Sequence, residues 1–221
     1  MSKYAIHACP QRMWYVNQYL VPSMLDQGIS ESDIMVKCDD KKLGNLTHCM
    51  DIFSHITQAG STWHLQDDVV ICKDFKKRTE EFQQNQIVCG FVVSNDGNVK
   101  HTGFVEPENM WWSFPCIHIP NNLARECVHW VYEVARYKSI YSWMIMANKY
   151  DDTFFKEFLK KVHPSIKVLN LKPNLVDHVD YLLGGSIINE ERKNKNVRAV
   201  WFEDLDLVEE LERKIDNGGN S

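Results

Sequence analysis

The stretch of residues 62–74 reads TWHLQDDVVICKD. It is an apolar, strand-like run that carries two adjacent aspartates, Asp67 and Asp68, in its middle. Unpaired carboxylates are rarely buried, because removing one from water costs several kcal/mol unless a partner or a metal compensates. The apolar segments TWHLQ and VVIC leave little room for a solvated charged face on either side of the pair. We therefore interpret the two aspartates as functional.

The segments before this pair alternate between strand and helix patterns. Residues 3–8 have strand character, apolar residues then recur at helical spacing over residues 13–27, and residues 33–40 form a second strand pattern. Helical periodicity over residues 46–56 leads into TWHLQ, the third strand. This order at short spacing predicts an α/β fold with a mostly parallel, Rossmann-like central sheet flanked by helices.

The segments after the pair continue the alternation around one long loop. Helices are expected over 75–86, from Asn121 or Asn122 to about Arg136, from 151 onward and over 202–216, and strands over 87–93, 111–120 and 167–171. Residues 94–110 and 172–189 are rich in turn residues, and we expect them to be irregular. Because the chain has no internal repeat, heptad run or linker, we predict one domain over residues 1–216 and a frayed tail over 217–221.

Composition narrows the class of protein. The chain has 221 residues, of which 44% are hydrophobic and 25% charged, and its net charge of −5 argues against broad affinity for nucleic acid or anionic membrane. No apolar run approaches the roughly 18 residues of a membrane helix, and the N-terminus lacks a signal pattern, so we expect a cytoplasmic protein. The seven cysteines are odd in number and widely spaced, which predicts reduced, buried thiols.

Aspartate pairs recur at positions where an α/β sheet binds ligands. The three pairs are Asp39-Asp40, Asp67-Asp68 and Asp151-Asp152. Two of them follow predicted strands and the third opens a predicted helix, and open α/β sheets bind ligands at the carboxyl edge of their strands. Carboxylates gathered there could hold a hard divalent cation and polar ligand hydroxyls. The alternatives are that Asp39 and Asp40 form a turn and that Asp151 is a helix N-cap.

Together these features resemble the GT-A fold of metal-dependent nucleotide-sugar glycosyltransferases, over roughly residues 3–190. In that family an acidic triplet, the DxD motif, ends a strand; here the triplet is Gln66-Asp67-Asp68, with glutamine in place of the first acid. The resemblance implies that Asp68 binds Mn²⁺ or Mg²⁺ and that Asp67 contacts the donor sugar or a metal-bound water. Gln66 then stands at the ribose or sugar contact. Hard oxygen ligands suit such ions.

Three further positions match the family. Asp39, or its neighbour Asp40, matches the aspartate that accepts a hydrogen bond from the uracil of the donor. In YDDTFF, Asp152 matches the general base of inverting members, with Asp151 as the alternative. The phrase PNLVDHVDYLLGGS is similar to a Pro-x-Leu-x-x-His stretch of several GT-A families, and it nominates His178 as a second metal ligand.

Five more residues are expected near a bound donor. They are Arg12, Asn45, Trp112, Arg192 and Arg198. Arg12 follows the first strand, where related folds often place a residue near the nucleotide, and Asn45 ends a glycine-containing loop. Arg192 or Arg198 could neutralise the leaving diphosphate, and Trp112 could shape the sugar pockets. The alternatives are a surface arginine at 12, a solvated basic loop and a core tryptophan.

The sequence therefore predicts a glycosyltransferase that uses a divalent metal and a nucleotide-sugar donor, with UDP-sugars favoured and inversion expected. The acceptor hydroxyl, on a glycan, lipid, protein or modified DNA, and the oligomeric state stay open. One alternative is a nucleotidyltransferase, although HACPQR after the first strand lacks the glycine-rich loop typical of that class. Another is a non-catalytic module that binds carbohydrate.

Overall fold

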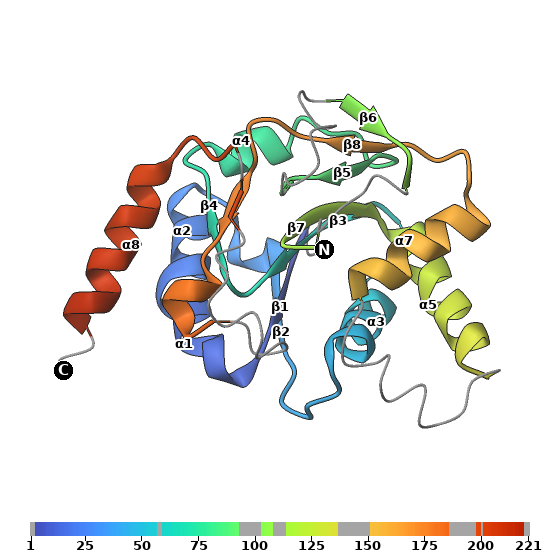
Figure 1. Ribbon diagram of the computed structural model, residues 1–221, viewed down its shortest axis with the longest axis horizontal. Helices are drawn as coiled ribbons and strands as arrows, with labels where there is room; N and C mark the ends of the chain where they lie inside the picture. Colours follow the sequence, from blue (N-terminus) through green and yellow to red (C-terminus); the bar gives the residue numbers. More distant parts are fainter. Residues whose placement is uncertain are drawn as a thin grey trace.

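A central seven-stranded sheet organises the chain (Figure 1). The computed structural model describes residues 3–56, 59–92, 103–107, 114–136, 151–185, 198–199 and 201–218. In spatial order the strands are β2 (Ile34–Cys38), β1 (Tyr4–Ala8), β3 (Ser61–Gln66), β7 (Cys116–Pro120), β5 (Ile87–Cys89), β8 (Val168–Asn170) and β6 (Gly103–Val105). Two further strands, β4 (Val69–Ile71) and β9 (Val176–His178), form a separate antiparallel sheet.

Most strands of the central sheet run in one direction. Strand β1 is parallel to both of its neighbours, β2 and β3, and β5 is parallel to β8. Strand β7 is antiparallel to β3 and β5, and β6 is antiparallel to β8, which leaves five of the seven strands pointing the same way. The predicted α/β fold with a mostly parallel central sheet flanked by helices is confirmed.

Helices cover both faces of the sheet, one group on the left and one on the right of Figure 1. The first group comprises α1 (Met13–Tyr15), a π-helical segment η2 (Val16–Leu20), α2 (Val21–Asp26), α4 (Phe75–Thr79) and α8 (Leu205–Gly218). The second group comprises α3 (Asn45–His55), α5 (Asn121–Arg136) and α7 (Asp151–Val162). Successive residues of a strand point to opposite faces of the sheet. In β5, Val88 therefore packs in the hydrophobic core on one face, whereas Ile87 and Cys89 pack in the core on the other.

Several predicted elements have different limits. The helix expected over 75–86 ends at Thr79, and the helix expected over 13–27 contains a π-helical segment. Residues 103–105, expected to be part of a loop, form the edge strand β6. Residues 172–189 were expected to be irregular, but they include strand β9 and a 3₁₀ helix, η5 (Asp180–Leu183). Strand β6 lies among turn residues and β9 has one apolar residue in three, so neither shows a strand pattern in the sequence.

The opening stretch divides into two strands that belong to different sheets. Strand β3 ends at Gln66, Asp67 and Asp68 form a turn, and β4 then pairs with β9. The register places Val69 opposite His178, and the amide of Val179 donates a hydrogen bond to the carbonyl oxygen of Asp68 at 2.8 Å. The second sheet therefore brings His178 next to the aspartate pair.

Two expectations from composition can be compared with the structure. All seven cysteines are free thiols; five are buried as predicted, whereas Cys9 and Cys38 are only partly buried. Within the described part of the chain, no helix combines the length and the apolar character needed to cross a bilayer.

The close contact of Gly90 with two buried side chains can be tested. A Cβ at Gly90 would lie 2.7 Å from Cys116 Sγ and 2.9 Å from Leu175 Cδ1, and both of these side chains are fully buried. We expect Gly90→Ala to lower the free energy of unfolding by about 1–3 kcal/mol, because the packed neighbours have to shift. Urea unfolding of both proteins measures the change. Gly103→Ala is the matched control, since a Cβ there meets nothing within 4 Å. Equal losses in the two variants would contradict this account of Gly90.

Candidate functional site

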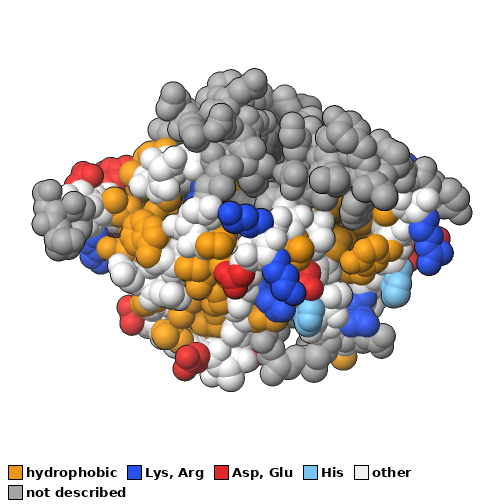
Figure 2. Space-filling view, turned by 90° about the horizontal axis from the view of Figure 1, so that it is seen from below, with side chains coloured by type: hydrophobic (Ala, Val, Ile, Leu, Met, Phe, Trp, Pro, Cys, Tyr) orange, Lys and Arg blue, Asp and Glu red, His pale blue; other side chains and the backbone are white. Residues whose placement is uncertain are grey.

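The predicted site residues follow strands that end at one edge of the sheet. The parallel strands β1, β2 and β3 finish at the lower edge of Figure 1, and Figure 2 views the molecule from that side. Acidic, basic and histidine side chains gather near the middle of this view, with apolar side chains on either side (Figure 2). This is the carboxyl edge, where open α/β sheets bind their ligands.

Asp67 and Asp68 are buried at this edge, each 5% exposed, and they share one cationic partner. The backbone amide of Cys9 donates a hydrogen bond to Asp67 Oδ2 at 2.7 Å, and Arg12 Nη1 donates to Asp67 Oδ1 at 3.1 Å. The same Nη1 donates to Asp68 Oδ2, and His178 Nε2 lies 3.1 Å from that oxygen. The turn formed by Asp67 and Asp68 thus lies between the segment that follows β1 and the end of β9.

Arg12 is the centre of this cluster. It closes a short 3₁₀ helix, η1 (Pro10–Arg12), that follows β1, and it is only 6% exposed. Its Nη2 donates a hydrogen bond to the carbonyl oxygen of Gly185 at 3.0 Å, whereas its Nε has no partner in the described part of the structure. Arg12 is therefore a buried cation, which excludes the alternative of a surface arginine.

His178 links the aspartate pair to a third carboxylate. Its Nδ1 lies 3.3 Å from Asp180 Oδ1, at the start of η5. Burial would lower the pKa of His178, but Asp68 and Asp180 together raise it to about 10. Burial would likewise raise the pKa of Asp68, yet His178 and Arg12 hold it well below its usual value. Asp68 therefore stays ionised, and His178 has to release a proton before its imidazole can bind a metal ion.

The donor atoms at this position fit a divalent cation. Asp68 Oδ1 is buried and has no hydrogen-bond partner among the described residues, and His178 Nε2 lies beside the other oxygen of the same carboxylate. Carboxylate oxygen and imidazole nitrogen both suit Mn²⁺. Within the described residues, no group of three or more His, Cys, Asp or Glu side chains is arranged to hold a metal ion. Two donor atoms would be enough only for an ion that completes its shell with water and phosphate, and metal binding by Asp68 and His178 stays a prediction.

The Asp39-Asp40 pair lies close to the same edge. Asp39 accepts hydrogen bonds from the amides of Leu43 at 2.7 Å and Gly44 at 3.1 Å, which is the turn-forming role that the sequence also allowed. Burial raises the pKa of the Cys38 thiol to about 12, with contributions from Asp40, Asp67 and Asp39. Donor contact by Asp39 or the exposed Asp40 stays a prediction.

The Asp151-Asp152 pair opens α7, beside α3 (Figure 1). Asp151 is 8% exposed, and its Oδ1 accepts a hydrogen bond from the amide of Asp152 at 2.9 Å. Burial, with a further contribution from Asp152, raises the pKa of Asp151 to about 7. Asp152 is more exposed, and its Oδ1 accepts from the amide of Thr153 at 2.6 Å. Among the described residues, no hydrogen bond or ion pair joins this pair to Asp67 or Asp68.

The remaining predicted residues fall into three groups. Arg198 donates through Nε to Asp177 Oδ2 at 2.9 Å, so it neutralises a carboxylate that is fully buried. Gln66 ends β3 and Asn45 begins α3, and both are partly buried near the carboxyl edge. Trp112 and Arg192 lie outside the described residues.

Sequence reasoning did not anticipate three contributions to the cluster. Cys9 and Gly185 act through backbone atoms, for which the sequence carries no side-chain signal. Asp180 follows His178 by two residues, and that spacing in the HVD segment could have suggested a partner for the imidazole.

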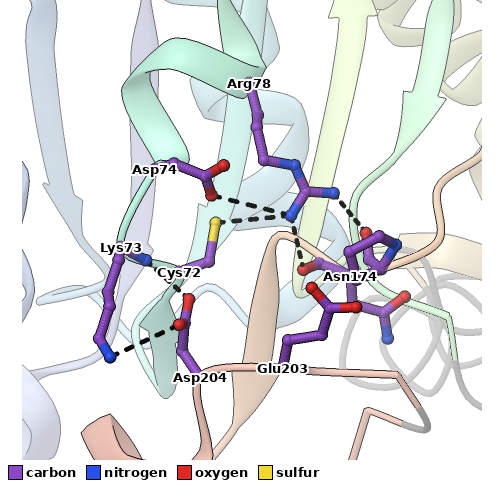
Figure 3. Close-up of a pocket in the computed structure, with 8 residues that line it drawn as sticks. Cys72, Lys73, Asp74, Arg78, Asn174, Glu203 and Asp204 are labelled. Atoms are coloured by element: carbon purple, nitrogen blue, oxygen red, sulfur yellow. Dashed lines mark hydrogen bonds and ion pairs between the residues drawn. The ribbon is translucent and has the colours of Figure 1, made fainter.

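A cavity of about 230 Å³ lies at the other end of β4 (Figure 3). Its lining residues are Cys72, Lys73, Asp74, Arg78, Pro173, Asn174, Glu203 and Asp204. Arg78 donates hydrogen bonds to the carbonyl oxygens of Pro173 at 2.5 Å and Asn174 at 3.3 Å, and Figure 3 shows it reaching across the cavity to them. Arg78 thus ties α4 to the segment that precedes β9, away from the aspartate pair.

Comparisons with known proteins add the following. No protein-family profile and no curated protein matches the sequence. HddC from Yersinia pseudotuberculosis aligns with a TM-score of 0.39 and 11% identity, over 77% of this chain and 90% of that chain. HddC complexed with GMP-PN aligns with a TM-score of 0.33 and 11% identity, over 57% and 80%. The galactosyltransferase LgtC, complexed with donor and acceptor sugar analogues, aligns with a TM-score of 0.36 and 10% identity, over 77% and 87%. Such TM-scores carry no argument about function.

The raised pKa of Asp151 predicts a pH-dependent stability. Because its folded-state pKa of about 7 exceeds the unfolded value of about 3.9, the contribution of Asp151 to stability falls as pH rises from about 4 to about 7. Asp151→Asn removes this pH-dependent contribution to stability and keeps an oxygen that accepts the hydrogen bond from the Asp152 amide. We expect the variant to melt several degrees above the wild type at pH 8, with the gap closing towards pH 4.5, in thermal unfolding by circular dichroism. The exposed Asp26→Asn is the control, and a constant gap across pH would contradict the assignment.

Proposed function

We propose that this chain is a metal-dependent glycosyltransferase that moves a sugar from a nucleotide-diphosphate sugar to an acceptor hydroxyl with inversion. UDP-sugars are the favoured donors. The observation that carries the proposal is the buried cluster of Asp67, Asp68, Arg12 and His178 at the carboxyl edge of parallel strands, in which Asp68 Oδ1 has no hydrogen-bond partner among the described residues. Buried carboxylates without full compensation are costly, so their retention supports a binding role.

The residues of the cluster suit distinct tasks in this reaction. Asp68 and His178 would hold a Mn²⁺ or Mg²⁺ ion, which when bound neutralises the charge that develops on the leaving diphosphate. Asp67 is fixed by the Cys9 amide and by Arg12, so its carboxylate has a defined position for a contact with the donor sugar or with water. Gln66 precedes it at the end of β3, and we assign it a contact with the ribose or sugar of the donor.

Asp151 and Asp152 are the proposed general bases. A base works best when its pKa is close to the operating pH, and the pKa of about 7 at Asp151 meets this condition. Asp152 is more accessible, which favours it for direct contact with an acceptor hydroxyl. The variants Asp151→Asn and Asp152→Asn distinguish the two candidates in the assay described next. The variant whose rate no longer rises with pH has lost the general base.

A donor screen tests the proposal. We expect the protein with Mn²⁺ to hydrolyse a UDP-sugar faster than GDP- or TDP-sugars, and a chelator to abolish the reaction. Asp68→Asn should lower the rate by roughly 100-fold or more, the loss typical when a group that stabilises transition-state charge is removed. Asp26→Asn, an exposed aspartate of α2, is the matched control and should keep the wild-type rate.

Other outcomes distinguish the alternatives. Release of pyrophosphate from a nucleoside triphosphate and a sugar phosphate would indicate a nucleotidyltransferase. Saccharide binding in calorimetry, without any binding of UDP and Mn²⁺, would indicate a carbohydrate-binding module. Either result, or no turnover and no binding with every donor, refutes the glycosyltransferase proposal.

A further inference from the structure

We propose that Arg12 is a resident cation of the aspartate pair and that a divalent metal binds Asp68 only by displacing it. The ion pair between Arg12 and Asp68 and the metal complex of Asp68 are then mutually exclusive states of one site. This inference rests on the metal ligands of the proposed function, Asp68 and His178, but not on the reaction that the site performs.

The first argument is geometric. Arg12 Nη1 donates to Asp67 Oδ1 at 3.1 Å and also to Asp68 Oδ2, so one nitrogen bridges the two carboxylates. That same Asp68 oxygen lies 3.1 Å from His178 Nε2. A metal held by His178 Nε2 together with the nearer Asp68 oxygen, Oδ2, takes the side of the carboxylate on which Arg12 Nη1 now lies. Because the guanidinium and a divalent ion are both cations and compete for the same buried oxygen, their repulsion favours displacement of the guanidinium when the metal enters.

The second argument concerns what Arg12 does when no metal is present. Asp67 and Asp68 are adjacent and both 5% exposed, so without a cation their mutual repulsion and desolvation would oppose folding. Arg12 supplies a cation that is always charged and whose planar nitrogens can contact both carboxylates at once. It therefore stabilises the protein before any ligand is present.

The third argument is that Arg12 is held incompletely. Among the described residues, the guanidinium has one partner besides the two carboxylates, the Gly185 carbonyl at 3.0 Å, and its buried Nε has none. A guanidinium with an unused donor gains a bond by moving to a ligand that can accept from it. Phosphate oxygens are such acceptors, so a diphosphate that arrives with the metal would receive the displaced Arg12.

Metal affinity of Arg12 variants, measured without nucleotide, tests the proposal. Arg12→Gln removes the competing cation, so we expect it to bind Mn²⁺ roughly tenfold or more tightly than the wild type, in titrations that follow free Mn²⁺ by electron paramagnetic resonance. Without metal the same variant should melt at a lower temperature than the wild type, and Mn²⁺ should raise its melting temperature more. Arg78→Gln is the matched control, because Arg78 also bonds backbone carbonyls but lies at the far end of β4, and its Mn²⁺ affinity should not change.

A second variant keeps the test decisive if Arg12→Gln does not fold. Arg12→Lys keeps the charge but offers a single nitrogen, which cannot bridge both carboxylates and also reach Gly185. Its Mn²⁺ affinity should lie between those of the wild type and Arg12→Gln. Unchanged or weaker affinity in whichever variant folds would overturn the proposal. Absence of Mn²⁺ binding in all the proteins would refute the metal site as well, whereas tight binding without turnover of any donor would refute the proposed reaction alone.

Discussion

The contact between Arg12 and the buried carboxylates of Asp67 and Asp68 is the interaction on which the rest of the structure depends. The two aspartates occupy the turn at which the chain leaves the central sheet after β3 and enters the second sheet as β4. Without a cation, two adjacent ionised groups could not be buried at this turn. Arg12 is placed there by β1, which lies beside β3 in parallel register, so sheet pairing and charge pairing reinforce each other.

The second sheet adds His178 to this arrangement of charges. Pairing of β4 with β9 sets His178 opposite Val69, one residue beyond Asp68, and the 3₁₀ helix that follows brings Asp180 to the other side of the imidazole. The cluster therefore draws on three separate parts of the chain that meet at the carboxyl edge. Strand pairing therefore brings these parts of the chain together at the site.

The sequence predicted those parts of the fold that have strong local patterns. The parallel core β2-β1-β3 and helices α3, α5 and α7 were predicted because their apolar periodicity extends over five or more residues. Strand β6 was missed because it lies in a segment rich in turn residues, and β9 because only one of its three residues is apolar. The burial of Arg12 could not be predicted from the sequence, because its partners lie 55 and 56 residues away and no local pattern indicates such a contact. For Asp39 the sequence allowed both a turn and a ligand contact, and only the turn is visible in the structure.

The most direct test is a crystal structure of the protein with Mn²⁺ and UDP, with data collected at the manganese absorption edge. The predicted result is one anomalous peak within bonding distance of the Asp68 carboxylate and His178 Nε2, with the UDP diphosphate beside it and Arg12 no longer on Asp68. A peak elsewhere, or UDP bound away from the carboxyl edge while Arg12 still bridges Asp67 and Asp68, would contradict the assignment of this cluster as the functional site.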